Sequence, residues 1–153
     1  TMVSVKEATK PYRIIYGKTR VGGNIVFAET TSDNDFIHLV YVVAGHEVNN
    51  ITKIFFDDAE VPLTQSGADS NGVARLFPSS GNTFENKVRI KKHLGTSSQA
   101  ADADLVNDVS QWTTDHRIRG KAYVYVRLEF DSDVFPSGIP NITFEVEGKR
   151  LFN

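Results

Sequence analysis

The sequence predicts an all-β domain, mainly antiparallel and of the sandwich or barrel-like kind, with one short helix. Short runs of Val, Ile, Phe and Tyr recur between clusters of Gly, Asn, Asp and Pro, as is typical of strands bounded by turns. In residues 120–131, Ala122, Val124 and Val126 alternate with Tyr123, Tyr125 and charged residues, which predicts one core face and one aromatic, charged face.

Further strands are expected at residues 13–16, 24–29, 36–44, 48–56, 73–77, 87–93 and 142–147. Segment 36–44 is apolar nearly throughout, as in a strand buried on both faces or at a sheet centre. The strands at 120–131 and 142–147 are expected to pair across the long loop 131–140. Residues 64–72 and 79–82 are rich in Gly, Ser and Asn, and are predicted to be loops.

One segment, residues 99–110, has apolar side chains close to a 3.6-residue period. This spacing predicts a single short helix. Ser97 or Ser98 is the expected N-cap, because a serine hydroxyl can accept a hydrogen bond from a free backbone N–H of the first turn.

Length and composition limit the domain organisation and the partners. With 153 residues, the chain is expected to form one domain over residues 11–153, after an expression-tag remnant and flexible lead-in at 1–10, where Met2 follows Thr1. The formal net charge of −2 provides no general basic field for nucleic acid or an anionic membrane. The sequence has no cysteine for disulfides or thiolate metal sites. Neither a membrane-spanning segment nor a secretory leader is predicted.

A phosphate-binding loop is the first candidate site. Gly17, Lys18 and Thr19 match the end of that motif, but Tyr12 occupies the position of its first glycine. The segment continues into Gly22 and Gly23 without a helical pattern, so a hairpin turn is favoured and no cofactor is expected.

Metal and catalytic sites are also weighed against structural roles. His38, His46, His93 and His116 form no short ligand pair, so no metal site is expected. An Asp115–His116 pair with Ser110 as nucleophile is disfavoured, because neighbouring side chains in an extended segment point to opposite faces. The carboxylate pairs are expected in turns rather than in an acid–base or calcium site; they are Asp57 with Asp58 and Asp131 with Asp133. No catalytic residue is assigned.

Residues 87–93 form a basic strand in which Lys87, Arg89 and Lys91 share one face. Two interpretations are open: a small nucleic-acid patch, or a charged edge strand whose lysines discourage aggregation. The edge strand is favoured, because no flanking aromatic residues are present for base stacking.

Several blocks of the chain together resemble the central region of the tail tip attachment or host-specificity protein J family of lambda-like siphophages and prophages. They are RIIYGKTRVGG (13–23), HLV (38–40), AGHEV (44–48), IFFDD (54–58), WTTDHRIRGKAYV (112–124), FPSGIPN (135–141), Phe144 and GKR (148–150). The resemblance implies one domain of a longer, baseplate hub-like protein that is trimeric and joins the tail tube to host-contacting tip structures. Its implied partners are other tail proteins, and its implied location is the virion, after synthesis in the bacterial cytoplasm.

The sequence therefore predicts a structural tail domain that is not an enzyme and whose isolated fragment is a monomer. A carbohydrate-binding module is the alternative, with Tyr123, Tyr125 and Phe135 as stacking platforms. A hydrolase is a third possibility. It requires some of six residues to converge in a pocket: Asp57, Asp58, Asp115, His116, Asp131 and Asp133.

Overall fold

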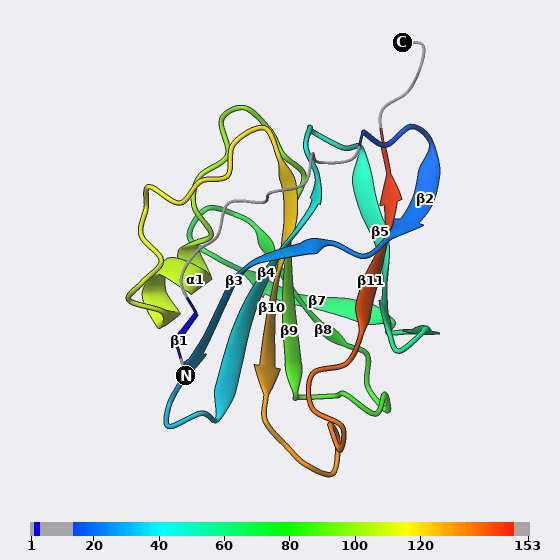
Figure 1. Ribbon diagram of the computed structural model, residues 1–153, viewed down its shortest axis with the longest axis vertical. Helices are drawn as coiled ribbons and strands as arrows, with labels where there is room; N and C mark the ends of the chain where they lie inside the picture. The colour runs from blue at the N-terminus through cyan, green and yellow to red at the C-terminus, as the bar shows by residue number, and fades with distance from the viewer. Residues whose placement is uncertain (1, 4–13, 149–153) are drawn as a thin grey trace.

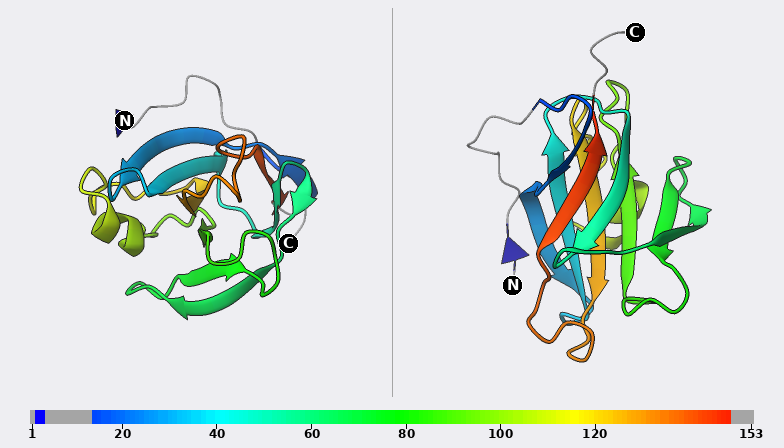
Figure 2. Two further views of the ribbon diagram at one scale, coloured as in Figure 1. Left: turned by 90° about the horizontal axis from the view of Figure 1, so that it is seen from below. Right: turned by 90° about the vertical axis from the view of Figure 1, so that its right-hand side faces the viewer.

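The chain folds into two antiparallel β-sheets that pack face to face (Figures 1 and 2). The computed structural model describes residues 2–3 and 14–148. One sheet has seven strands in the order β1-β3-β4-β10-β9-β8-β7, and the other has four in the order β2-β11-β5-β6. The predicted fold class is confirmed: the domain is a sandwich with one short helix, α1 (Ala103–Asp108).

The seven-stranded sheet contains the longest strands. In spatial order these are β1 (Met2–Val3), β3 (Asn24–Thr31), β4 (Phe36–Ala44), β10 (Ala122–Glu129), β9 (Val88–His93), β8 (Ala74–Pro78) and β7 (Leu63–Ala68). The four-stranded sheet consists of β2 (Lys18–Val21), β11 (Ile142–Glu147), β5 (Asn50–Phe56) and β6 (Ala59–Glu60). Strands that are distant in sequence thus become neighbours, as with β4 and β10.

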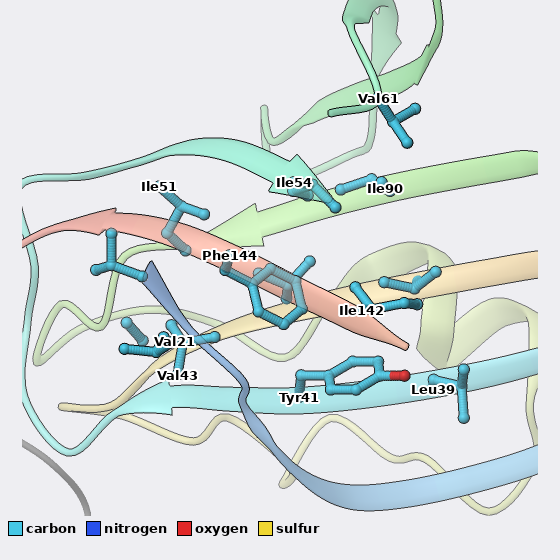
Figure 3. Packing of buried hydrophobic residues seen from close by; sticks show 14 of the residues in the cluster. Val21, Leu39, Tyr41, Val43, Ile51, Ile54, Val61, Ile90, Ile142 and Phe144 are labelled. Carbon is cyan, nitrogen blue, oxygen red and sulfur yellow. The ribbon is translucent and has the colours of Figure 1, made fainter. Parts of the chain in front are cut away.

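Alternating apolar residues fill the space between the sheets (Figure 3). Tyr41 of β4 and Phe144 of β11 meet across this space with ring centroids 5.3 Å apart. Burial raises the pKa of Tyr41 to about 12. Val124 and Val126 of β10 are fully buried in the same core. The inward set of each strand therefore follows the two-residue period that the sequence shows.

A second apolar layer lies on the other face of the seven-stranded sheet. The segment that contains α1 covers this face, on the side away from β11 (Figure 1). Leu105 and Trp112 pack there with Tyr123, and the rings of Trp112 and Phe27 are 5.1 Å apart. The expected burial of β4 on both faces is confirmed. The aromatic face of β10 is buried too, because the α1 segment adds a layer that strand periodicity cannot reveal.

The expected pairing of the last two long strands is wrong. β10 pairs with β4 and β9, whereas β11 pairs with β2 and β5 in the opposite sheet. The loop between them therefore crosses from one sheet to the other. Alternation in two successive strands indicates which faces are buried, but it does not distinguish pairing in one sheet from packing across two.

The structure also differs from the sequence-based predictions in one helix, one loop and one strand. The helix is shorter than residues 99–110, and Asp102 caps it in place of Ser97 or Ser98 by accepting a hydrogen bond from Leu105 N at 3.0 Å. β7 occupies much of the expected loop 64–72. Residues 14–16 form no strand, and Arg13 lies outside the described residues. The expectations for residue 1, residues 4–13 and residues 149–153 also fall outside them.

The chain enters and leaves the small sheet at one point. β2 pairs with β11 so that Lys18 stands opposite Glu147. Just beyond, Gly148 N donates to Gly17 O at 2.7 Å. A Cβ at Gly148 would lie 2.1 Å from Ile15 O, so the close approach of the two segments requires glycine.

Candidate functional site

A buried cluster of charges lies on the α1 side of the seven-stranded sheet. Lys91 of β9 has no exposed side-chain surface, and its ammonium contacts three carboxylates. The shortest distances from Nζ are 2.7 Å to Asp69, 3.2 Å to Asp102 and 3.2 Å to Asp104. Because β9 lies between β8 and β10, the favoured interpretation of this strand as a charged edge is wrong. Its cation is buried and neutralised by acids from other segments.

The carboxylates around Lys91 also shape the backbone. Asp69 accepts hydrogen bonds from the N–H groups of Asn71 and Val73 and so fixes the turn between β7 and β8. Burial alone would raise the pKa of Asp69, but Lys91 and these N–H groups bring it below its ordinary value. Asp102 has the same balance: His93 and Lys91 outweigh burial and lower its pKa. Both groups are therefore held as carboxylates.

A chain of hydrogen bonds runs across the sheet beside this cluster, and Arg89 Nη1, 4.0 Å from Asp104 Oδ2, connects the two. Arg89 donates to the Tyr125 hydroxyl at 3.0 Å and to Asp108 at 2.9 Å. The same hydroxyl lies 2.6 Å from His38 Nδ1, and His38 Nε2 lies 2.7 Å from the Thr31 hydroxyl. Burial is the main cause that lowers the pKa of His38 to about 4, and Arg127 and Arg89 add to it against the opposing effect of Asp108. His38 is therefore neutral at pH 7 and has a structural role.

A cleft of about 740 Å³ opens beside the charge cluster. Its walls come from the β7–β8 turn, β8, the chain leading into α1, α1 itself and the loop 114–119. The lining residues are Ser70, Asn71, Arg75, Ala100, Ala101, Ala103, Asp104, Val106, Asn107, Thr114, Arg117 and Arg119. The cleft therefore joins segments that are far apart in the sequence.

The three arginines of the cleft are held in different ways. Arg75 forms a two-point contact with Asp104, with Nε–Oδ2 at 2.7 Å and Nη2–Oδ1 at 2.9 Å. Arg119 Nε donates to Gln99 O at 3.0 Å, and Arg117 Nε donates to Thr114 O at 3.2 Å. The carbonyl contacts hold the Nε of each guanidinium. The Nη groups of Arg119 have no carboxylate partner among the described residues, whereas Nη2 of Arg117 faces Asp115. Asp115 lies 3.8 Å from Arg117 but is 88% exposed.

The structure does not bring the candidate hydrolase residues together. Asp58 pairs with Arg20, whereas Asp131 pairs with Lys87. Asp57 Oδ1 accepts from Asn141 N, and Asp133 N donates to Asp131 Oδ1, as expected of turn residues. The remaining pair, Asp115 and His116, lies in the loop after α1, where His116 stacks on Trp112. Across residues 2–3 and 14–148, no group of three His, Asp or Glu side chains is arranged to hold a metal ion.

Two other sequence-based interpretations need correction. Tyr123 and Tyr125 have no exposed surface and Phe135 is 6% exposed, so none of the three is a sugar-stacking platform. The Gly17–Gly23 segment is not a hairpin turn, because β2 belongs to the small sheet and β3 to the large one. Lys18–Val21 is β2 itself, and Gly22 and Gly23 link it to β3. Gly23 packs so closely that a Cβ would lie 3.0 Å from Tyr41 Cβ.

The cleft and its lining cannot be recognised in the sequence alone. Arg117 and Arg119 belong to the block 112–124 that supports the family resemblance, but nothing in their spacing indicates a cleft. Its other residues lie in a turn, a strand and a helix start, and only the fold makes them neighbours. The burial of Lys91 is not evident from the sequence, because alternation in 87–93 is equally typical of an exposed basic face.

Comparisons with known proteins give a structural match only. No protein-family model matches the chain, and no curated protein matches it. Among solved structures, the fold is similar to that of a chain in the virion of a native gene transfer agent (GTA) particle, with a TM-score of 0.54 and 19% sequence identity. The match covers 95% of this chain and 29% of that chain. The present fold thus corresponds to less than a third of the longer protein.

Proposed function

We propose that this chain is a structural domain of a phage-like virion, and that it belongs to a tail tip or baseplate hub protein. The observation that carries the proposal is the extent of the structural match: nearly the whole chain matches a small part of a much longer virion chain. A similar fold does not by itself transfer a function, so the role must be tested in particles.

The tail location rests on the sequence resemblance to the protein J family. In this proposal, the domain helps to link the tail tube to host-contacting tip structures. Its partners are other tail proteins and, in the full-length hub, two further copies in a trimer. It is made in the bacterial host cytoplasm and acts in the assembled virion without binding nucleic acid. In the described part of the chain, no helix is long and apolar enough to cross a bilayer.

We also propose that the domain acts through its surfaces and not through catalysis. The dispersed positions of Asp57, Asp58 and the other candidate carboxylates support this. The charged side chains that converge around Lys91 form ion pairs with one another. A neutralised, buried cluster of this kind supports a rigid scaffold.

The test is to purify particles from the bacterium that carries the intact gene and to probe them with antibodies raised against this chain. The proposal expects peptides of the domain in the particles by mass spectrometry and immunogold label at one end of the tail. Particles that lack the protein would refute the virion role. Label confined to the capsid would refute the tail assignment and leave the broader role.

A further inference from the structure

Among the charged side chains that line the cleft beside α1, cations outnumber carboxylates. It contains three arginines and one carboxylate, and that carboxylate, Asp104, is already bonded to Arg75 and Lys91. Arg117 has a long ion pair of 3.8 Å with the exposed Asp115, and Arg119 has no carboxylate within ion-pair distance among the described residues. The cleft is therefore a local positive site on a chain whose formal net charge is −2.

The walls of the cleft are rigid for a surface site. Asn71 Nδ2 donates to Ala101 O at 3.2 Å, which ties the β7–β8 turn to the chain before α1. Asp69 and Asp102, on either side of this contact, are anchored to buried Lys91. A ligand would therefore meet arginines on a preformed frame and would lose little affinity to ordering the site.

The uncharged residues of the lining limit which classes of ligand the cleft can bind. Ala100, Ala103 and Val106 give a small apolar strip, and Asn107 and Thr114 add polar groups, but the lining contains no aromatic side chain. Sugars and nucleobases are commonly held by aromatic stacking. Guanidinium groups instead pair with carboxylates through two parallel hydrogen bonds. This combination favours a peptide segment with acidic side chains.

We propose that this cleft binds an acidic segment of a partner protein, with Arg117 and Arg119 contacting its carboxylates and the strip formed by Ala100, Ala103 and Val106 contacting its aliphatic parts. The inference rests on the proposed function only for the identity of the partner, which would be another tail protein. The binding chemistry itself is a property of the isolated chain.

The test uses the chain as it stands, with a fluorescently labelled hexaglutamate peptide as the probe and anisotropy as the readout, at an ionic strength of about 0.15 M. Saturable binding is expected. Arg119→Ala and Arg117→Ala should each weaken binding about tenfold, because each removes a charge-assisted contact. Arg20→Ala is the matched control, since Arg20 is a partly exposed arginine of the other sheet that pairs with Asp58. A hexaglutamine peptide controls for the backbone.

Three results would overturn the proposal: no saturable binding of hexaglutamate, equal losses in the Arg20 and Arg119 variants, or equal binding of the hexaglutamine peptide. Inorganic phosphate that competes as well as unlabelled hexaglutamate would show a site for small anions instead. Circular dichroism of each variant checks that its fold is unchanged. Peptide binding by a chain that is absent from particles would refute the virion role and leave the cleft assignment intact. If the chain is present in particles but does not bind the peptide, the cleft assignment is refuted and the virion role stands.

Discussion

The ammonium of Lys91 lies 2.7 Å from a carboxylate oxygen of Asp69, and neither side chain has any exposed surface. Lys91 is in a central strand of the large sheet, and Asp69 is in the turn that follows β7. Their contact joins two segments that are 22 residues apart. It is the centre of the cluster that also includes Asp102 and Asp104.

Replacement of Lys91 by methionine is expected to destabilise the fold strongly. It leaves Asp69 and Asp102 buried without their cation, at a cost of about 3–5 kcal/mol in the free energy of unfolding. Urea denaturation measures the loss. Lys53→Met is the control, because Lys53 is an exposed lysine of β5, and it should change stability by less than about 0.5 kcal/mol. Equal effects of the two changes would contradict the buried cluster.

Stability should fall as the pH decreases from 6.5 towards 4 because of His38. Its pKa is about 4 in the folded protein against an ordinary value of 6.5, so the unfolded chain binds more protons in this window. Between pH 7 and 4.5 the contribution lost is about 2 kcal/mol. Unfolding free energies of the wild type and His38→Gln at both pH values measure it. A pH dependence as steep in the variant as in the wild type would show that other groups are responsible.

The two faces of β10 should differ in their tolerance of substitution. Val126 is fully buried between the sheets, so Val126→Asp places an unpaired carboxylate in the core and should cost more than about 3 kcal/mol. Arg127 is partly exposed and lies over the Phe36 ring, 4.9 Å from its centroid. Arg127→Ala should therefore cost about 1 kcal/mol or less. Melting temperatures of the two variants test the order, which equal decreases would contradict.

The layer that contains α1 should contribute substantially to stability. Trp112 is 2% exposed and contacts Phe27 and His116, so Trp112→Ala should cost about 3–5 kcal/mol. Ile139→Ala is the control, because Ile139 is 46% exposed, and its cost should be near zero. Denaturation followed by far-ultraviolet circular dichroism measures both. A small effect at Trp112 would mean that the α1 layer adds little to the fold.

The isolated chain is expected to be a monomer, or at most a weak oligomer, whereas the full-length hub is expected to be a trimer. The sequence has no heptad pattern or long exposed apolar run, and stable association requires roughly 1,000 Å² of buried interface. Light scattering at micromolar concentration tests this. A stable trimer would show that this domain carries the trimer interface itself. A tight dimer would count against the hub proposal, because a two-fold contact does not fit a three-fold symmetric hub.

The sequence predicts a strand well where both of its faces are apolar and buried. β4 has the predicted bounds because its nine residues are almost all apolar. Prediction is wrong where burial depends on distant partners. Lys91 is buried only because Asp69, Asp102 and Asp104 converge on it, and no local pattern encodes that convergence. The same reason applies to Tyr123 and Tyr125, whose expected exposure is removed by the α1 segment.

The candidate site is also formed by residues that are distant in the sequence. Charges and turns could be identified residue by residue, and Asp57, Asp58, Asp131 and Asp133 do lie in turns. The cleft could not be predicted, because Arg75 reaches it from β8 and Arg119 from the loop before β10. Their proximity depends on the strand order of the large sheet.

The contact between Gly17 and Gly148 has a mechanical consequence for a longer polypeptide that continues on both sides of this domain. Lys18 and Glu147 are paired at the same end of an antiparallel ladder. Once β1 has detached from β3, a tensile force applied through the two flanking segments would therefore separate β2 from β11 one hydrogen bond at a time, starting at Gly148. Such peeling requires much less force than shearing the whole ladder at once. After the loss of the short β1–β3 pairing, the small sheet would open at low force, unless the flanking segments are held together by the parts they connect.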